Sequence, residues 1–149
     1  MLRKIFGVVA GYIAMAALIF ILFTTLYLIL GADSAFKPGN YQASTTWLVL
    51  STILGLIAAV IGGLVCVIIA KDHKAAIWLA GLVLVLGIIL AIPSLNVPDE
   101  EMNKVREGNV YNIEAMQNAK QPPIALILNP IIGAIGIIAG SRLTKNKPA

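Results

Sequence analysis

Few side chains in this sequence could carry out covalent or metal chemistry. Its 149 residues include one cysteine, Cys66, and one histidine, His73, which has no second His or carboxylate at ligand spacing. A hydrolytic triad or a metal centre needs several such groups at fixed spacing. A single cysteine also excludes an internal disulfide. No cofactor and no metal are therefore expected, and Cys66 is interpreted as a small packing residue, because a thiol in apolar surroundings is inert.

The adjacent carboxylates Asp99, Glu100 and Glu101 are the strongest candidates for acid–base chemistry. They follow Pro98, which is typical of a helix start where negative charge is favourable. No positioned base or nucleophile accompanies them. An enzyme built on these acids is the weakest of three functions considered, and the chain is predicted not to be an enzyme.

A few uncharged polar side chains lie within long apolar stretches. Asn129 and Pro130 are the most informative, since Pro130 removes a backbone donor and predicts a helix kink. The amide of Asn129 needs a partner in an apolar environment. It either bonds to a Ser or Thr on a neighbouring helix or lines an outward-facing polar cavity. The candidate polar cluster, expected in the outer half of the membrane, is Thr24, Thr25, Ser51, Thr52 and Asn129.

The elements that position these residues follow from composition. The chain is 59% hydrophobic and 12% charged, whereas soluble domains are about 25% charged. A helix needs about 20 apolar residues to cross a membrane. The sequence therefore predicts an all-α polytopic integral membrane protein, a single four-transmembrane-helix bundle over residues 1–149. The expected spans are residues 5–30, 46–70, 75–93 and 122–141. The first span is expected to be a retained helix, because its apolar run exceeds the usual length in signal peptides.

The basic residues indicate how the chain is oriented. Most of them fall near the termini and in the inner loop 71–74, which predicts that both termini are cytoplasmic. The outer loops are then residues 31–45 and 94–121. The second is expected to be partly helical, with two short amphipathic helices separated by Gly108 and Asn109. The tail 144–149 is interpreted as a topology signal. The expected location is the bacterial cytoplasmic (inner) membrane.

Small residues at a spacing of three or four recur in every span, which lets helix backbones approach closely in lipid. The sequence predicts a compact bundle, with a small-residue stripe left over for another subunit. The predicted helix-packing residues are Gly7, Gly11, Gly55, Ala59, Gly63, Gly136 and Gly140.

Two non-enzymatic functions follow from these patterns. The first is helix–helix association as an accessory or assembly subunit of a membrane complex, with the lipid bilayer and another membrane subunit or a homo-oligomer as partners. The alternative is an oligomeric channel or transporter for a neutral small molecule or lipid, with an outward-facing polar vestibule. No nucleic acid is expected, because the eleven Lys and Arg residues are scattered. No charged residue lies within a span, which argues against a proton-coupled transporter.

Overall fold

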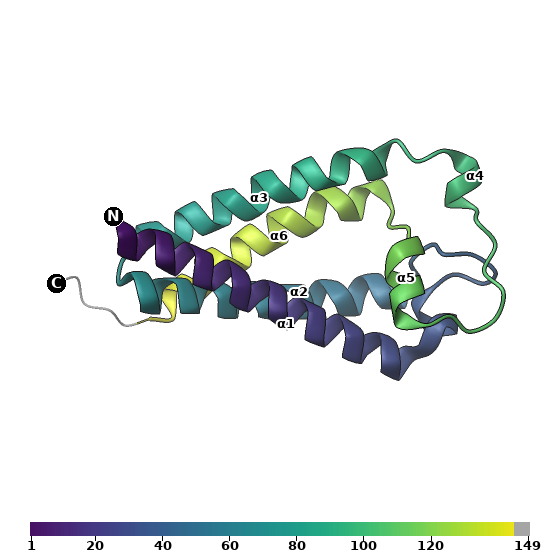
Figure 1. Ribbon diagram of the computed structural model, residues 1–149, viewed down its shortest axis with the longest axis horizontal. Helices are drawn as coiled ribbons and strands as arrows, with labels where there is room; N and C mark the ends of the chain where they lie inside the picture. The colour runs from purple at the N-terminus through teal and green to yellow at the C-terminus, as the bar shows by residue number, and fades with distance from the viewer. Residues whose placement is uncertain (145–149) are drawn as a thin grey trace.

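The protein is a bundle of four long helices with a smaller loop region at one end (Figure 1). The computed structural model describes residues 1–144, and for Asp99 it describes only the backbone. The rest of the predicted basic tail, residues 145–149, lies outside this part of the chain. The long helices are α1 (Leu2–Ala35), α2 (Thr45–Ala70), α3 (Lys74–Leu95) and α6 (Pro123–Arg142).

All four long helices are long and apolar enough to span a membrane. The prediction of an all-α bundle with four spans is confirmed, and the chain has the character of a multi-pass membrane protein. Two short helices, α4 (Asp99–Met102) and α5 (Asn112–Asn118), lie in the loop between α3 and α6. The start of α1 and the end of α6 lie together with the α2–α3 turn, and we call this the terminal end. The opposite end is the loop end.

Local chemistry explains where several helices begin and end. The hydroxyl of Ser44 accepts from the backbone N–H of Trp47 at 3.0 Å and caps the start of α2. Lys71 ends α2 in a left-handed conformation (φ 54°). α1 is interrupted at Gly31, where φ is 71° and the backbone leaves the helical region. α6 instead continues through Pro130 as one helix.

The helices pack as two pairs that close at the terminal end. α1 lies along α2, α2 crosses α6, and α6 lies along α3, whereas α1 and α3 share little contact. A methyl group on Gly63 would overlap the backbone oxygen of Ile137, and one on Gly140 would overlap that of Val60. α2 and α6 therefore touch backbone to backbone, as in close helix pairs in lipid. Toward the loop end the α1–α2 pair and the α3–α6 pair diverge (Figure 1).

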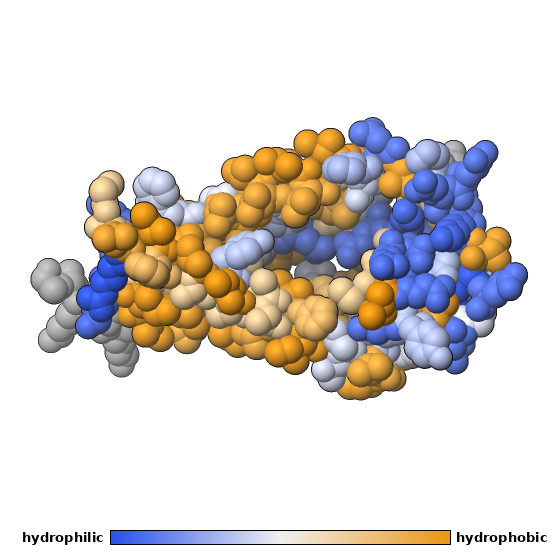
Figure 2. Space-filling view, in the orientation of Figure 1, coloured by the Kyte–Doolittle hydropathy of each residue, from blue (hydrophilic) through white to orange (hydrophobic). Residues whose placement is uncertain are grey.

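The two connecting segments at the loop end form one folded unit, which we call the cap (residues 36–44 and 96–122). Short backbone bridges join Asn40 to Val105 and Gln42 to Lys120. Phe36 and Tyr41 of the cap stack edge to face on each other, and Phe36 also stacks on Tyr27 of α1. The surface is hydrophobic along the helices and hydrophilic over the cap (Figure 2).

Candidate functional site

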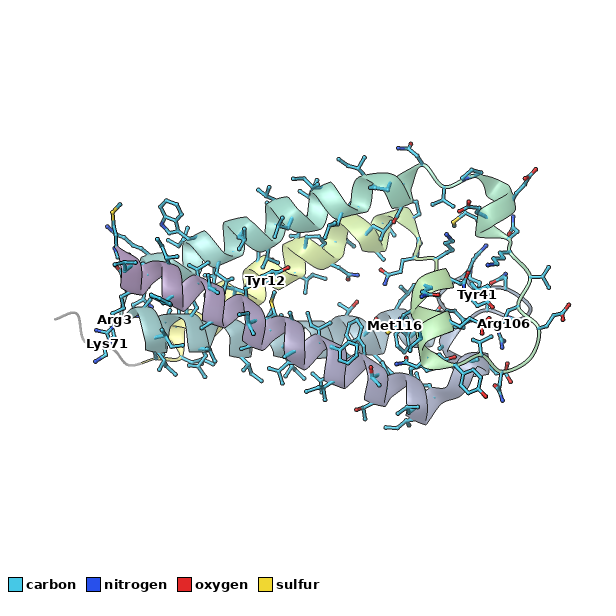
Figure 3. The ribbon with its side chains drawn as sticks, in the orientation of Figure 1. Arg3, Tyr12, Tyr41, Lys71, Arg106 and Met116 are labelled. Atoms are coloured by element: carbon cyan, nitrogen blue, oxygen red, sulfur yellow. The ribbon has the colours of Figure 1, made fainter. Side chains whose placement is uncertain are left out.

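A long hollow, which we call the apolar groove, runs along one face of α1. It has a volume of about 390 Å³. Its floor extends from Tyr12 to Tyr27, and its loop end is covered by Phe36, Trp47 and α5. Tyr27 lies fifteen positions after Tyr12, so the floor covers about 22 Å of helix. Tyr12 and Met116 are on its floor and its covering helix, respectively (Figure 3).

The periodicity of α1 builds this floor. Residues that line the groove recur every three or four positions and so share one helix face. The face carries four of the five aromatic residues of α1, and Phe23 and Tyr27 both stack edge to face on Trp47. The lining residues that α1 contributes are Tyr12, Met15, Ala16, Ile19, Phe20, Phe23, Thr24 and Tyr27.

Polar contacts are concentrated where α5 covers the groove. Asn112 donates from its Nδ2 to the hydroxyl of Thr24 at 3.3 Å. The phenol of Tyr27 donates to the backbone oxygen of Val110 at 2.7 Å. These two bonds tie the start of α5 and the segment just before it to α1. The groove is therefore apolar along most of its length and polar at its loop end.

A second tyrosine holds α5 from the side of the cap. Tyr41 is buried and its hydroxyl donates to the Glu114 carboxylate at 2.8 Å. This hydrogen bond, together with burial, raises the pKa of Tyr41 above its ordinary value. The bond between Tyr41 and Glu114 joins the first connecting segment to α5.

A second hollow, the interhelical cavity, lies between the two helix pairs and has a volume of about 240 Å³. It shares Met15, Ile19 and Phe23 of α1 with the apolar groove. Ser51, Thr52 and Asn129 line it together with apolar residues of all four long helices. Thr52 donates to Asn129 Oδ1 at 3.5 Å, and Asn129 Nδ2 donates to Gln121 Oε1 at 3.3 Å. Figure 2 shows a hollow between the halves of the molecule with hydrophilic residues inside it.

The structure divides the predicted polar cluster into three parts. Ser51, Thr52 and Asn129 come together in the interhelical cavity, and Thr24 lies in the apolar groove. Thr25 is exposed on the outside of α1 and donates to the backbone oxygen of Ile21. The split follows from helix geometry, because consecutive residues point about 100° apart. Pro130 packs its ring against Gly87 of α3 beside the cavity.

The predicted packing residues also fall into two groups. Six of them lie at contacts between helices of this chain, and Gly55 instead lines the interhelical cavity with open space beside it. Gly7 and Gly11 pack on α2 near Cys66. The other four, at the contact of α2 with α6, are Ala59, Gly63, Gly136 and Gly140.

The side chains with reactive potential lie apart from these hollows. Cys66 is buried against Gly11, and His73 is exposed at the terminal end. Within the described part of the chain, no three His, Cys, Asp or Glu side chains lie close enough to hold a metal ion. What the groove and cavity offer is an apolar surface and a few neutral hydrogen-bonding groups, which suits noncovalent binding.

Sequence reasoning missed several lining residues of the apolar groove, above all Tyr12, Phe20, Asn112 and Met116. The aromatic face of α1 was a visible signal in the sequence. The contribution of α5 was not, because the path of a long loop back over a helix is not encoded in local periodicity.

Comparison with known proteins offers no further guide to the site. No protein-family model, no curated protein and no solved structure matches this chain. The geometry of the hollows and the chemistry of their walls therefore carry the functional argument.

Proposed function

We propose that this protein is a non-enzymatic membrane protein that binds a lipid, with one acyl chain held in the apolar groove. The observation that carries this proposal is the form of the groove, which is long, apolar along α1 and polar only beneath α5. An amphipathic molecule has the same division into a long apolar part and a polar end. It shares only the lipid with the alternative indicated by the sequence, which was an oligomeric channel or transporter for a neutral small molecule or lipid.

The position of the groove supports a lipid over a water-soluble ligand. α1 and α3 share little contact, so α3 does not pack closely along the side of α1. Exposed Phe20 and Ala16 on the groove wall would face the hydrocarbon of the bilayer. An acyl chain could enter sideways from the membrane and fill the hollow, gaining dispersion contacts that an empty space lacks.

The packing of the bundle weakens the case for association as the primary function. That case relied on small-residue stripes left over for a partner helix. Six of the seven predicted packing residues instead lie against neighbouring helices of the same chain. Gly55, the seventh, lines the interhelical cavity and not an outer surface.

The charge distribution supports an orientation for the groove. Arg3, Lys4, Lys71, Lys74 and Arg142 lie at or beside the terminal end, where cytoplasmic positive charge is expected. We infer a bacterial cytoplasmic membrane with this end inside. The cap then faces outward, and the groove takes its lipid from the outer leaflet.

Filling the groove tests the proposal. Ala16 lines the groove and is exposed, so Ala16→Trp would occupy the hollow without disturbing a buried contact. The matched control is Ala17→Trp, because Ala17 is also exposed but points about 100° away. The purified protein is incubated with a lipid that carries a photoreactive acyl chain, and cross-linked residues are located by mass spectrometry.

The expected result is cross-linking concentrated at residues 12–27 and 112–119 in the wild type. Ala16→Trp should reduce this labelling severalfold, and Ala17→Trp should leave it unchanged. Equal labelling of the two variants, or labelling spread evenly over the exposed faces of α1 and α3, would show that the groove holds only ordinary surrounding lipid and would overturn the proposal.

A further inference from the structure

A third hollow, the rim cavity, adjoins the apolar groove at the loop end. It has a volume of about 370 Å³ and lies between the end of α3 and the start of α6. Met116 and Ala119 line both the rim cavity and the apolar groove. The two hollows therefore meet at α5.

Four of the nine described residues that line the rim cavity are polar. Lys120 is the charged residue among its described lining residues, and Ser94, Gln117 and Gln121 contribute polar groups. The Oε1 atom of Gln121 already accepts from Asn129 Nδ2 at 3.3 Å. Its NH₂ group is therefore the part that Gln121 can offer to a ligand. An ammonium and an amide donor that line one cavity suit a ligand rich in acceptor oxygens.

The backbone of Lys120 is held in place by the first connecting segment. Its N–H donates to Tyr41 O at 2.9 Å, and its carbonyl accepts from Ala43 N–H at 2.8 Å. Its ammonium has an acidic neighbour, Glu101, at 3.5 Å. The Lys120 side chain is 22% exposed and that of Glu101 is 65% exposed. A long ion pair with one partner in water contributes little, so an incoming anion can displace Glu101.

We propose that the rim cavity binds the phosphate of a phospholipid whose acyl chain lies in the apolar groove, with Lys120 and Gln121 as donors. This inference rests on the proposed function and specifies its substrate class. Lysine binds phosphate as a compact charge, and phosphate supplies acceptor oxygens for the Lys120 ammonium and the Gln121 amide. The contacts of the acyl chain with the apolar groove provide most of the binding energy, and the rim cavity selects the headgroup.

The test compares two photoreactive lipids with identical chains, phosphatidylglycerol and diacylglycerol, on the full protein in dodecyl maltoside micelles. The measured quantity is the ratio of their labelling at residues 12–27. In the wild type, phosphatidylglycerol should label roughly fivefold more strongly, as expected for one partly exposed charge contact. Lys120→Gln should bring the ratio close to one while diacylglycerol labelling persists, and Lys120→Arg should keep most of the preference.

Two further variants make the test specific. Lys104→Gln is the matched control, because Lys104 also lies in the cap but binds Asn118 at 2.6 Å and sits over the Tyr41 ring. It should leave the ratio unchanged. Glu101→Gln removes the competing carboxylate and should raise the ratio.

The possible results distinguish phosphate binding in the rim cavity from acyl-chain binding in the apolar groove. A ratio of one in the wild type, or an unchanged ratio in Lys120→Gln, overturns the phosphate assignment while leaving chain binding intact. Absence of groove labelling by both lipids overturns the proposed function itself. Inorganic phosphate equimolar with the probe should not alter the ratio. If it abolishes the preference, the site takes free phosphate and the assignment to a lipid headgroup is wrong.

Discussion

Arg106 carries a buried cation at the point where the cap meets α1. Its side chain is 4% exposed, and its Nη2 lies 2.8 Å from Asp33, whose side chain is 83% exposed. Its other terminal nitrogen donates to the carbonyl of Gly108, and the guanidinium lies 6.0 Å from the Phe36 ring centroid. Within residues 1–144, its Nε has no hydrogen-bond partner. A buried cation with a solvated partner adds little net stability. What Arg106 does is fix the second connecting segment against the end of α1.

A charged contact at the terminal end makes a pH-dependent prediction. Asp72 Oδ2 lies 2.6 Å from Lys4 Nζ, and Asp72 Oδ1 accepts from the backbone N–H of Lys74 at 2.8 Å. The bond from Lys4, followed by that from Lys74, lowers the pKa of Asp72 below its ordinary 3.8. As pH falls below 3.8, the unfolded chain takes up the proton first. The contact therefore stabilises the fold at neutral pH, and this contribution is lost as pH falls through the lowered pKa.

The expected result is that Lys4→Ala moves the pKa of Asp72 back toward 3.8. A carbon-13 NMR titration of the Asp72 carboxyl in detergent micelles measures the shift. Lys71→Gln serves as the control, because it removes a nearby charge at the same end without removing either hydrogen bond to Asp72. An Asp72 pKa that is equal in the wild type and in Lys4→Ala would contradict this account.

The long helices differ in what holds them together along their length. At the terminal half of α2, Gly63 meets the backbone of α6, and Gly62 packs on Met15 of α1. Two turns closer to the loop end, Gly55 has open space within 4 Å of where a Cβ would lie. Glycine in α2 therefore lies at a helix–helix contact near the terminal end and lines a cavity nearer the loop end.

This difference predicts opposite tolerance to the same substitution. Gly63→Ala should destabilise the bundle by about 1–3 kcal/mol, because the added methyl would overlap the backbone oxygen of Ile137. Gly55→Ala should be neutral or slightly stabilising, since alanine favours a helix more than glycine does. Thermal unfolding of the two variants in the same detergent provides the comparison. Equal losses would mean that α2 and α6 do not touch at Gly63.

The molecule as a whole owes its hollows to the way its two helix pairs diverge. The pairs are joined by backbone contact near the terminal end and separate toward the cap (Figure 1). The interhelical cavity opens between them, and the apolar groove lies on the flank of the first pair beneath α5. The cap closes the wide end, so the shape of both hollows depends on how the whole bundle is arranged.

The sidedness of the bundle is tested by cysteine labelling. Cys66 is buried, and Cys66→Ala gives a background without thiols. In that background, Asn109→Cys in the exposed cap should react with a membrane-impermeant maleimide applied to intact cells. His73→Cys, exposed at the terminal end, should react only after the cells are lysed. Labelling of position 73 but not 109 in intact cells would reverse the orientation and place the groove in the inner leaflet.

Part of the candidate site could be predicted from local pattern. The sequence pointed to Asn129 as a polar residue in need of a partner, and the structure pairs it with Thr52 and Gln121. It grouped Thr24 with Thr25 because both lie at the same depth in a span. Depth follows from counting residues, but the helix face that meets a neighbour depends on packing, and these two residues point in different directions.

Hydrophobic runs long enough to cross a membrane determined the four helices, because backbone groups in lipid must find partners within their own segment. That requirement is local and can be read directly along the chain. Which small residues bring helices together, how far the pairs separate, and that α5 returns to cover α1 depend on contacts between distant residues. The tertiary structure alone decided these features, and with them the position of the groove and of Lys120 at its rim.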